Sequence, residues 1–221
     1  DAEGQQVPYQ ITSDEKVIFP VTVQANGSAV YTIKVGIPQE CPVKACGRYY
    51  PERVDDVAWE NDLTAFRAYG PALQETGERA FGYDIWTKYN TTEPVVEARY
   101  EGELNPDMKT KIAELGKTDP KAAQELYRSV SYHVDHGNGL DCYKVGPTLG
   151  GGTTALMAGD TIVYPYCYAT QEILDNGPLR FTVKLVYNPL VVKGDSTIIE
   201  TRIITLDAGS YCNKTVVSYT H

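Results

Sequence analysis

Hydrophobic and polar residues alternate with a period of two along the first forty residues. One alternating run covers residues 17–23, and a second apolar run covers residues 30–35. Between them lies Ala25-Asn26-Gly27-Ser28, in which the Asn-Gly pair tolerates the positive φ angles of a tight turn. The pattern predicts a β-hairpin here, preceded by a short strand over residues 7–11.

Strand periodicity is strongest in the last third of the chain. Alternate apolar residues from Phe181 to Tyr187 and from Ile199 to Thr205 keep a strict period of two. We predict strands at residues 64–69, 83–87, 142–145, 155–157, 161–163, 166–168, 179–187 and 196–206. Residues 41–56, which contain two prolines and a glycine, are expected to form an irregular connection. Long alternating strands joined by hairpins indicate antiparallel sheets, each with one buried face.

Helical signals are confined to residues 105–130. Asn105-Pro106 and Asp119-Pro120 each combine an N-cap residue with a proline at the first helical position, and Gly116 is expected to end the first helix. The segment therefore predicts a helical hairpin inserted between strands. Its polar surface fits an exposed insertion, and a lid beside the following histidines is one role open to it.

Composition limits the partners of the chain. The 221 residues suit one large β-domain, and the formal net charge of −9 argues against nucleic acid and against an anionic membrane surface. An anionic sugar stays among the candidate ligands, because a local basic cluster can bind it inside an acidic protein. No apolar run is long enough to cross a bilayer. The start at Asp1, inside a turn, resembles a processed or excised piece.

Candidate chemistry is densest in residues 132–146, which read YHVDHGNGLDCYKVG. His133 and His136 are candidate general acids or bases, with Asp135 as a partner, because histidine exchanges protons near neutral pH. The alternative is that both rings only brace an ordered loop. The spacing lacks the further ligands of a transition-metal site, so no metal or other cofactor is assigned, while calcium stays open. Substrate-binding roles in this segment are assigned to Asp141, Tyr143 and Lys144.

A second polar and aromatic stretch lies upstream. Glu60 is the other candidate catalytic partner, and Arg67 could bind a substrate carboxylate in a bidentate manner. Further substrate-binding candidates are Trp59, Asn61, Tyr69, Trp86 and Lys88. Each has a structural alternative: the tryptophans as core residues, the carboxylates in turns, and Arg67 in an ion pair with Glu60. The site hypothesis requires this stretch and residues 133–144 to meet in one concavity.

Four segments carry a resemblance to a known family: RYYPERVDDVAWEND (48–62), AFRAYGPAL (65–73), GYDIWTK (82–88) and residues 132–146. In this order they resemble a family described as a domain of unknown function. Its members are secreted proteins of polysaccharide-degrading bacteria, often encoded beside pectin- and uronate-processing enzymes. The family is similar to the galactose-mutarotase-like β-sandwiches, which include aldose epimerases and polysaccharide lyases. Its members extend beyond both ends of this chain.

The resemblance implies a mainly β protein, an antiparallel β-sandwich (galactose-mutarotase-like supersandwich) forming one domain over residues 1–221. It also implies a secreted or periplasmic protein with a carbohydrate ligand. We expect it to act on an oligosaccharide that contains uronic acid, by lyase- or epimerase-like acid–base chemistry. The alternatives are a non-catalytic glycan-binding protein and a structural module of a larger secreted protein.

Overall fold

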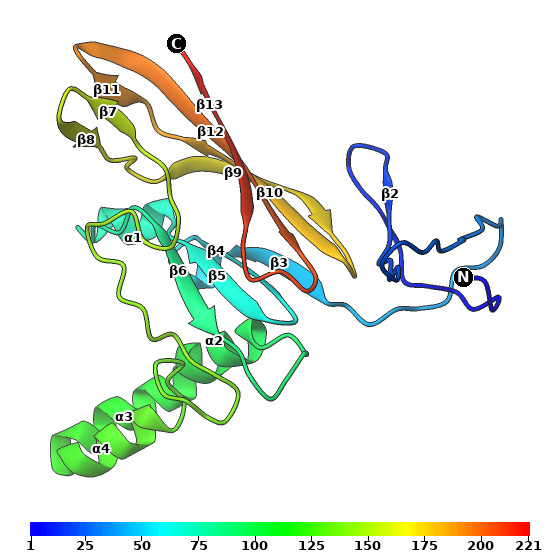
Figure 1. The fold of residues 1–221 in the computed structure, drawn as a ribbon. Coiled ribbons are helices and arrows are strands. Elements are labelled where there is room, and N and C mark those ends of the chain that lie inside the picture. The colour runs from blue at the N-terminus through cyan, green and yellow to red at the C-terminus, as the bar shows by residue number, and fades with distance from the viewer.

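A computed structural model describes all of residues 1–221, and antiparallel sheets dominate it (Figure 1). A four-stranded sheet has the order β3-β4-β5-β6, from Ala45–Tyr50, Asp56–Asn61, Thr64–Ala68 and Tyr83–Thr87. A five-stranded sheet combines β9 (Tyr168–Asn176), β10 (Arg180–Tyr187), β11 (Leu190–Val192), β12 (Asp195–Asp207) and β13 (Lys214–Thr220). Two small hairpins pair β1 (Gln10–Ile11) with β2 (Val17–Ile18) and β7 (Leu156–Ala158) with β8 (Thr161–Val163). The expectation of a mainly β, antiparallel protein is confirmed.

Side chains from both large sheets meet in one apolar core. The predicted alternation of β10 is confirmed, because Phe181, Val183, Leu185 and Tyr187 all point inward and are buried. From the smaller sheet, Trp59 stacks on Phe181 with ring centroids 6.2 Å apart. The core therefore follows from the period-two pattern of the two sheets, whose inner faces bury it between them.

The opposite face of the four-stranded sheet is also covered. Trp86 and Tyr100 pack there with Tyr132, and Tyr100 belongs to helix α2 (Val96–Leu104). As a result all six residues of β4 are buried, including its polar ones. A sheet that is covered on both faces places charged side chains in the interior, and this positions the candidate site described below.

The helical hairpin is present as α3 (Pro106–Thr118) and α4 (Pro120–Arg128). The predicted caps are confirmed: Asn105 Oδ1 accepts from Met108 N at 3.0 Å, and Asp119 Oδ1 accepts from Ala122 N at 3.0 Å. Gly116 does not end α3, which continues to Thr118, because the Asp119-Pro120 cap sets the boundary. The pair projects away from the sheets (Figure 1), and α3 has no buried residue. Two further helices, α1 (Pro71–Glu75) and α2, were not predicted.

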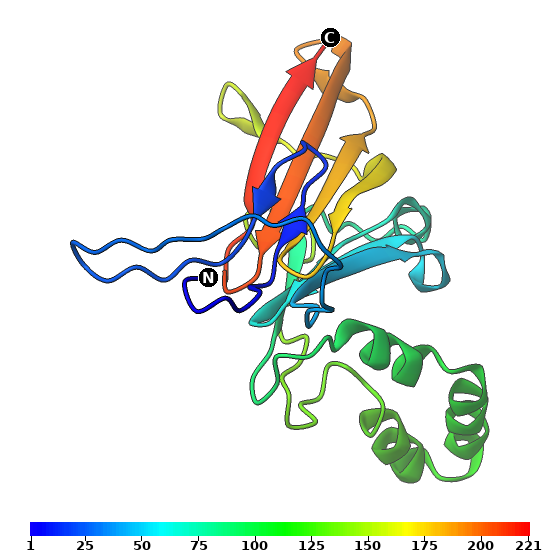
Figure 2. The ribbon, with the colours of Figure 1, turned by 90° about the vertical axis from the view of Figure 1, so that its right-hand side faces the viewer.

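The predicted N-terminal hairpin is wrong in its strands. Residues 19–43 contain no strand and form an extended arm beside the sheets (Figure 2). Only the turn is present, closed by the bond from Gly27 N to Gln24 O at 2.9 Å. Apolar residues of the arm stay exposed, and Ile33 is 90% accessible. Alternation specifies a strand only where another strand supplies hydrogen bonds, and the arm has no such neighbour.

Two other expectations are corrected. The presumed irregular connection at residues 41–56 contains β3 and a short 3-10 helix, η1 (Pro51–Arg53). Residues 142–145, predicted as a strand, form a loop. The residue before them, Asp141, makes an isolated antiparallel bridge to Trp86. This loop runs along the edge of β6 and supplies one wall of a cleft.

Candidate functional site

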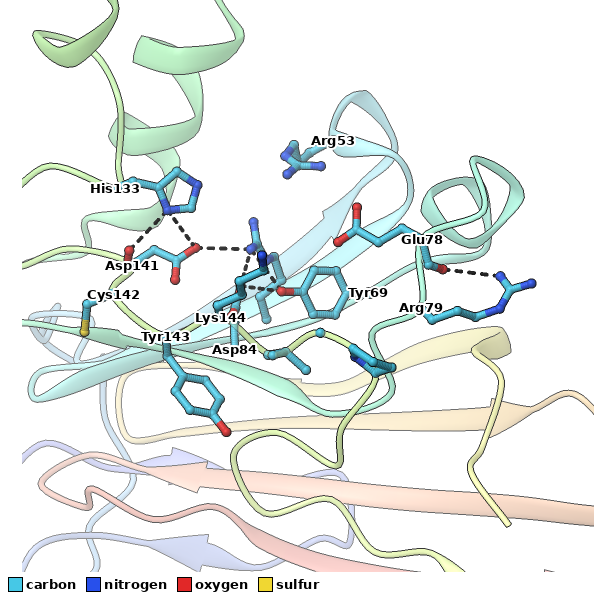
Figure 3. Close-up of a pocket in the computed structure, with 14 residues that line it drawn as sticks. Arg53, Tyr69, Glu78, Arg79, Asp84, His133, Asp141, Cys142, Tyr143 and Lys144 are labelled. Atoms are coloured by element: carbon cyan, nitrogen blue, oxygen red, sulfur yellow. Dashed lines mark hydrogen bonds and ion pairs between the residues drawn. The ribbon is translucent and has the colours of Figure 1, made fainter. Parts of the chain in front are cut away.

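A cleft of about 680 Å³ opens on the face of the four-stranded sheet that is turned away from the large sheet (Figure 3). Cross-strand register builds its floor, because Arg67 of β5 lies opposite Asp84 of β6. Its walls come from η1, from the segment after α1 and from the loop that follows His133. The lining residues are Arg53, Arg67, Tyr69, Glu78, Arg79, Asp84, His133 and the run 141–147.

A histidine oriented by an aspartate lies at one wall of this cleft. The Nδ1 atom of His133 lies 3.1 Å from the backbone oxygen of Asp141 and 3.5 Å from its carboxylate. A carbonyl oxygen can only accept, so Nδ1 carries the proton and Nε2 of the neutral ring keeps its lone pair. The His133 side chain is 50% exposed, while the Asp141 side chain is buried. The ring is therefore held by one edge and offers a free basic nitrogen.

Arg67 forms the buried centre of the site. Its guanidinium pairs with Asp84, lies 3.2 Å from Asp141 Oδ2, and has Asp56 Oδ2 at 3.9 Å from its Nε. It also donates to the hydroxyls of Tyr69 and Tyr132. One buried cation thus faces three buried carboxylates.

This imbalance changes the acidity of the carboxyl groups. Burial, together with the nearby Asp84 charge, raises the pKa of Asp141 to about 6 against the opposing effects of Arg67 and His133. Burial likewise raises the pKa of Asp56 to about 6, although Arg67 and Arg53 oppose the shift. The physical cause is the loss of hydration of the ionised form in the interior. Asp56 and Asp141 therefore exchange protons near pH 6.

Three other cations line the cleft without a matching acid. Arg53, Arg79 and Lys144 have no carboxylate within 4.0 Å, although the chain as a whole is acidic. Arg53 donates from Nε and Nη2 to the Tyr132 hydroxyl, at 3.3 and 3.1 Å. Arg79 donates to two backbone oxygens. The cleft lining therefore carries three cations without a close acid, together with Glu78, which has no cation within 4.0 Å (Figure 3).

The structure brings together six of the residues that the sequence singled out: His133, Arg67, Tyr69, Asp141, Tyr143 and Lys144. Reasoning from sequence missed Arg53, Glu78, Arg79 and Asp84. Asp84 could have been found, because strand alternation places it on the face of Trp86, in register with Arg67. Arg53 offered a weaker signal, since it follows a proline in a charged stretch that was expected to be irregular.

The indole rings assigned to sugar binding lie in the interior. Trp59 is fully buried between the sheets, and its Nε1 donates to Asn213 at 2.9 Å. Trp86 is 1% exposed and stacks on Tyr132. Asn61 is buried and ties its own turn to the backbone of Asp207 and Ser210. None of these side chains lines the cleft. Trp59 points into the core between the sheets, and Trp86 is covered by Tyr100 and Tyr132.

Glu60 and Lys88 form a structural pair rather than a substrate site. Lys88 Nζ lies 2.8 Å from Glu60 Oε2, and both side chains are buried. Glu60 also accepts from the backbone N–H groups of Val95 and Val96 at the start of α2. The carboxylate therefore docks a helix terminus, where a negative charge is favourable.

Asp135 and His136 organise their own loop outside the cleft. Asp135 is exposed, accepts from Gly137 N and Gly139 N, and pairs with the Tyr89 hydroxyl, which lowers the pKa of the carboxyl group. His136 Nε2 lies 3.0 Å from the Ser131 oxygen. The acidic partner of His133 is thus Asp141, which had been assigned to substrate binding, and neither Asp135 nor Glu60.

Two features of other protein classes are absent from the structure. No group of three or more His, Cys, Asp or Glu side chains is arranged to hold a metal ion. Among the helices, none combines the length and the apolar character that a membrane crossing requires.

Comparison with known proteins gives a family and a distant relative. No solved structure matches the chain. A protein of Formosa agariphila, described as "Uncharacterized protein P7", is 28% identical over 182 residues, which is 79% of this chain and 40% of that protein. The chain thus spans well under half the length of this relative. The family profile described as "Domain of unknown function (DUF4861)" matches residues 1–221. The chain therefore belongs to the DUF4861 family.

Proposed function

We propose that the cleft binds an oligosaccharide containing uronic acid and acts on it by acid–base chemistry of the lyase or epimerase kind. The observation that carries this proposal is the orientation of His133. Its Nδ1 is fixed by the backbone oxygen of Asp141 at 3.1 Å, its Nε2 has no hydrogen-bond partner in the protein, and half of the side chain is exposed. A base held in this way is ready to take a proton from a ligand in the cleft.

The size and the charge of the cleft support the substrate class. A volume of about 680 Å³ exceeds the needs of a single sugar ring and suits a short stretch of a chain. The cations that lack acidic partners favour a ligand with negative charge. The half-buried Tyr69 and the exposed Tyr143 offer flat faces with hydroxyl tips, which suit sugar rings.

The proposed reaction begins beside the sugar carboxylate. His133 Nε2 takes the proton from the ring carbon that bears the carboxylate, and the electron pair moves into the carboxyl group. A cation at that carboxyl is required, because the enolate-like state is otherwise too costly. In a lyase the electron pair then forms a double bond to the next carbon, whose bond to the glycosidic oxygen breaks. The leaving oxygen takes the proton that His133 had accepted. In an epimerase the carbon takes a proton from water on the opposite face of the ring, and His133 gives the first proton back to the solvent.

The finer fold and location belong to the same proposal. We propose that the two large sheets are part of a galactose-mutarotase-like β-sandwich and that the protein acts outside the cytoplasm, secreted or periplasmic. The shared core of the two sheets is compatible with such a sandwich. Uronate oligosaccharides are the test substrates that correspond to the proposed ligand.

The proposal predicts that His133→Gln abolishes turnover. We expect at least a 100-fold loss relative to the wild type, in the range of about 10²–10⁴ that general bases contribute. The measurement is incubation with pectic and other uronate oligosaccharides, following the ultraviolet absorbance of new double bonds and the masses of the products.

His136→Gln is the matched control, because this ring lies three residues away and faces the Ser131 oxygen outside the cleft. It should stay within a few-fold of the wild type. Equal activity of the His133 variant and the wild type would refute the proposal. Binding of the sugar without turnover by any variant would instead favour a non-catalytic glycan-binding protein.

A further inference from the structure

We infer that Arg53 is the residue that binds the anionic group of the sugar and thereby selects charged over neutral ligands. The inference rests on the proposed function and names a residue that the sequence did not reveal. It concerns specificity, so Arg53 and the base His133 are separable by experiment.

Arg53 and Arg67 differ in how far the protein itself balances their charge. Arg67, which together with Lys144 was a candidate to bind the sugar carboxylate, already faces Asp56, Asp84 and Asp141 and is 4% exposed. A ligand carboxylate would have to displace buried partners from Arg67. Arg53 is half-buried and lines the cleft with no carboxylate within 4.0 Å. A ligand can still neutralise its charge, as it can those of Arg79 and Lys144, but only Arg53 is linked to the floor residue Arg67 through the Tyr132 hydroxyl.

Hydrogen bonds hold the guanidinium group of Arg53 in place. Nε and Nη2 of Arg53 donate to the Tyr132 hydroxyl, which also accepts from Arg67 Nη1 at 3.2 Å. The phenol oxygen thus ties both guanidinium groups together and fixes the plane of Arg53. Nη1 of Arg53 has no partner in the protein, and it is not sealed from solvent. A fork with a fixed plane and free N–H donors is suited to a carboxylate.

A strained turn follows directly after Arg53. Its residues Val54 and Asp55 have φ angles of 48° and 64°, in the left-handed region. A β-branched residue rarely adopts this region, and such outliers persist only where the surroundings impose them.

Neighbouring groups impose this turn from several sides. The carboxylate of Asp55 accepts from Ala72 N at 3.3 Å and pairs with the Tyr49 hydroxyl, while its backbone oxygen accepts from Tyr168. Gly70 packs so closely that a Cβ atom there would lie 1.8 Å from the Asp55 oxygen. The fold therefore holds this turn, and with it Arg53, in a fixed position at the cleft.

Arg48 shows the contrast within the same hairpin. Its guanidinium pairs with Glu97 at 2.7 Å and with Glu52 at 2.6 Å, so its charge is matched within the protein. Arg53 lies five residues further along, has no carboxylate within 4.0 Å and donates to the Tyr132 hydroxyl. Of the two arginines in this hairpin, the one that lines the cleft is the one without a close acid.

The test compares a galacturonate trisaccharide with its methyl ester, which lacks the carboxylate charges and carries methyl groups in their place. Titration calorimetry is carried out in a His133→Gln background, so that neither sugar is turned over while binding is measured. With Arg53 present, the protein should bind the charged sugar about 10- to 100-fold more tightly, in line with a charge-assisted pair of hydrogen bonds. Arg53→Gln should lose this preference, and Arg53→Lys should retain part of it, because it keeps the charge without the planar fork.

Arg128→Gln, on the exposed face of α4, is the control for net charge and should keep the wild-type preference. Circular dichroism of each variant checks that the fold is intact. An Arg53→Gln variant that is folded and still prefers the charged sugar would overturn the inference and leave the proposed function standing. A wild type that binds neither sugar would overturn both.

Discussion

Arg67 and Arg53 share the Tyr132 hydroxyl, yet their surroundings give them different roles. Three carboxylates surround Arg67, so its charge is used to hold buried acids in place. Removing one member of such a cluster leaves the others uncompensated, which is costly in the interior. Arg53 has no carboxylate within 4.0 Å, is half-buried at the cleft and can bind a ligand. At the scale of single residues, the division between scaffold and site follows from which charges the protein itself neutralises.

Val54 should tolerate glycine unusually well. Its φ of 48° costs a β-branched residue about 1–2 kcal/mol, and glycine removes that cost. We expect Val54→Gly to leave the free energy of unfolding unchanged or to raise it by about 1 kcal/mol, as measured by urea denaturation.

The control is Val57→Gly, at the second residue of β4, where valine is fully buried. This substitution creates a cavity and loosens a strand, so we expect a loss of about 3 kcal/mol or more. A loss of similar size in Val54→Gly would show that the left-handed conformation at Val54 is not a source of strain.

The chemistry of a residue type predicted only part of the candidate site. His133, Asp141 and Lys144 do line the cleft, because a glycine-rich polar loop after a helix remained at the surface. Glu60 and Trp59 belong to a strand that is buried on both faces. Their local sequence does not indicate that a further element packs on the second face of the sheet. That element is α2, more than thirty residues later.

Among the elements, local signals were predictable and pairing partners were not. The capped starts of α3 and α4 depend on side chains within three residues of each other, and the structure has both. The alternating arm at residues 19–43 depends on a partner strand, which the pattern cannot supply. Strand β3 was missed for the opposite reason. It pairs with β4 although residues 41–56, in which it lies, contain two prolines and a glycine.

Close backbone approach explains how these elements place the cleft. Gly70 lies against the Asp55 backbone, so the β3–β4 turn and the start of α1 are in contact. The loop that carries Asp141 bridges to Trp86 at the edge of β6. A turn and a loop, each fixed by backbone contacts, therefore hold Arg53 and His133 over the floor formed by Arg67 and Asp84. None of these contacts was visible as a local pattern.

For the whole molecule, the buried acids should make stability depend on pH. Asp56 and Asp141 have their pKa values raised from 3.8 to about 6 in the folded protein. The folded state then binds protons more tightly than the unfolded state, so stability falls as pH rises from about 4 to 6. We expect the free energy of unfolding to be about 1–2 kcal/mol higher at pH 5 than at pH 7.5, measured by urea denaturation at both values.

The carboxyl groups with lowered pKa values, such as Asp14 and Asp135, do not obscure this window. Their contribution is lost only as pH falls below their unfolded values, near 4. Asp56→Asn removes one of the two raised groups and should reduce the difference between pH 5 and pH 7.5 by roughly half. Greater stability at pH 7.5 than at pH 5 in the wild-type protein would contradict the assignment of buried, proton-binding acids.

The most direct measurement is an NMR titration of the histidine rings with the galacturonate trisaccharide. The chain has only three histidines, and the His133→Gln and His136→Gln variants assign their signals. We predict that His133 is the tautomer protonated at Nδ1 and that its ring signals shift to saturation as the sugar binds, while those of His136 and His221 do not. A His133 ring that stays unperturbed while the sugar saturates the protein would contradict the proposal that this base faces the substrate.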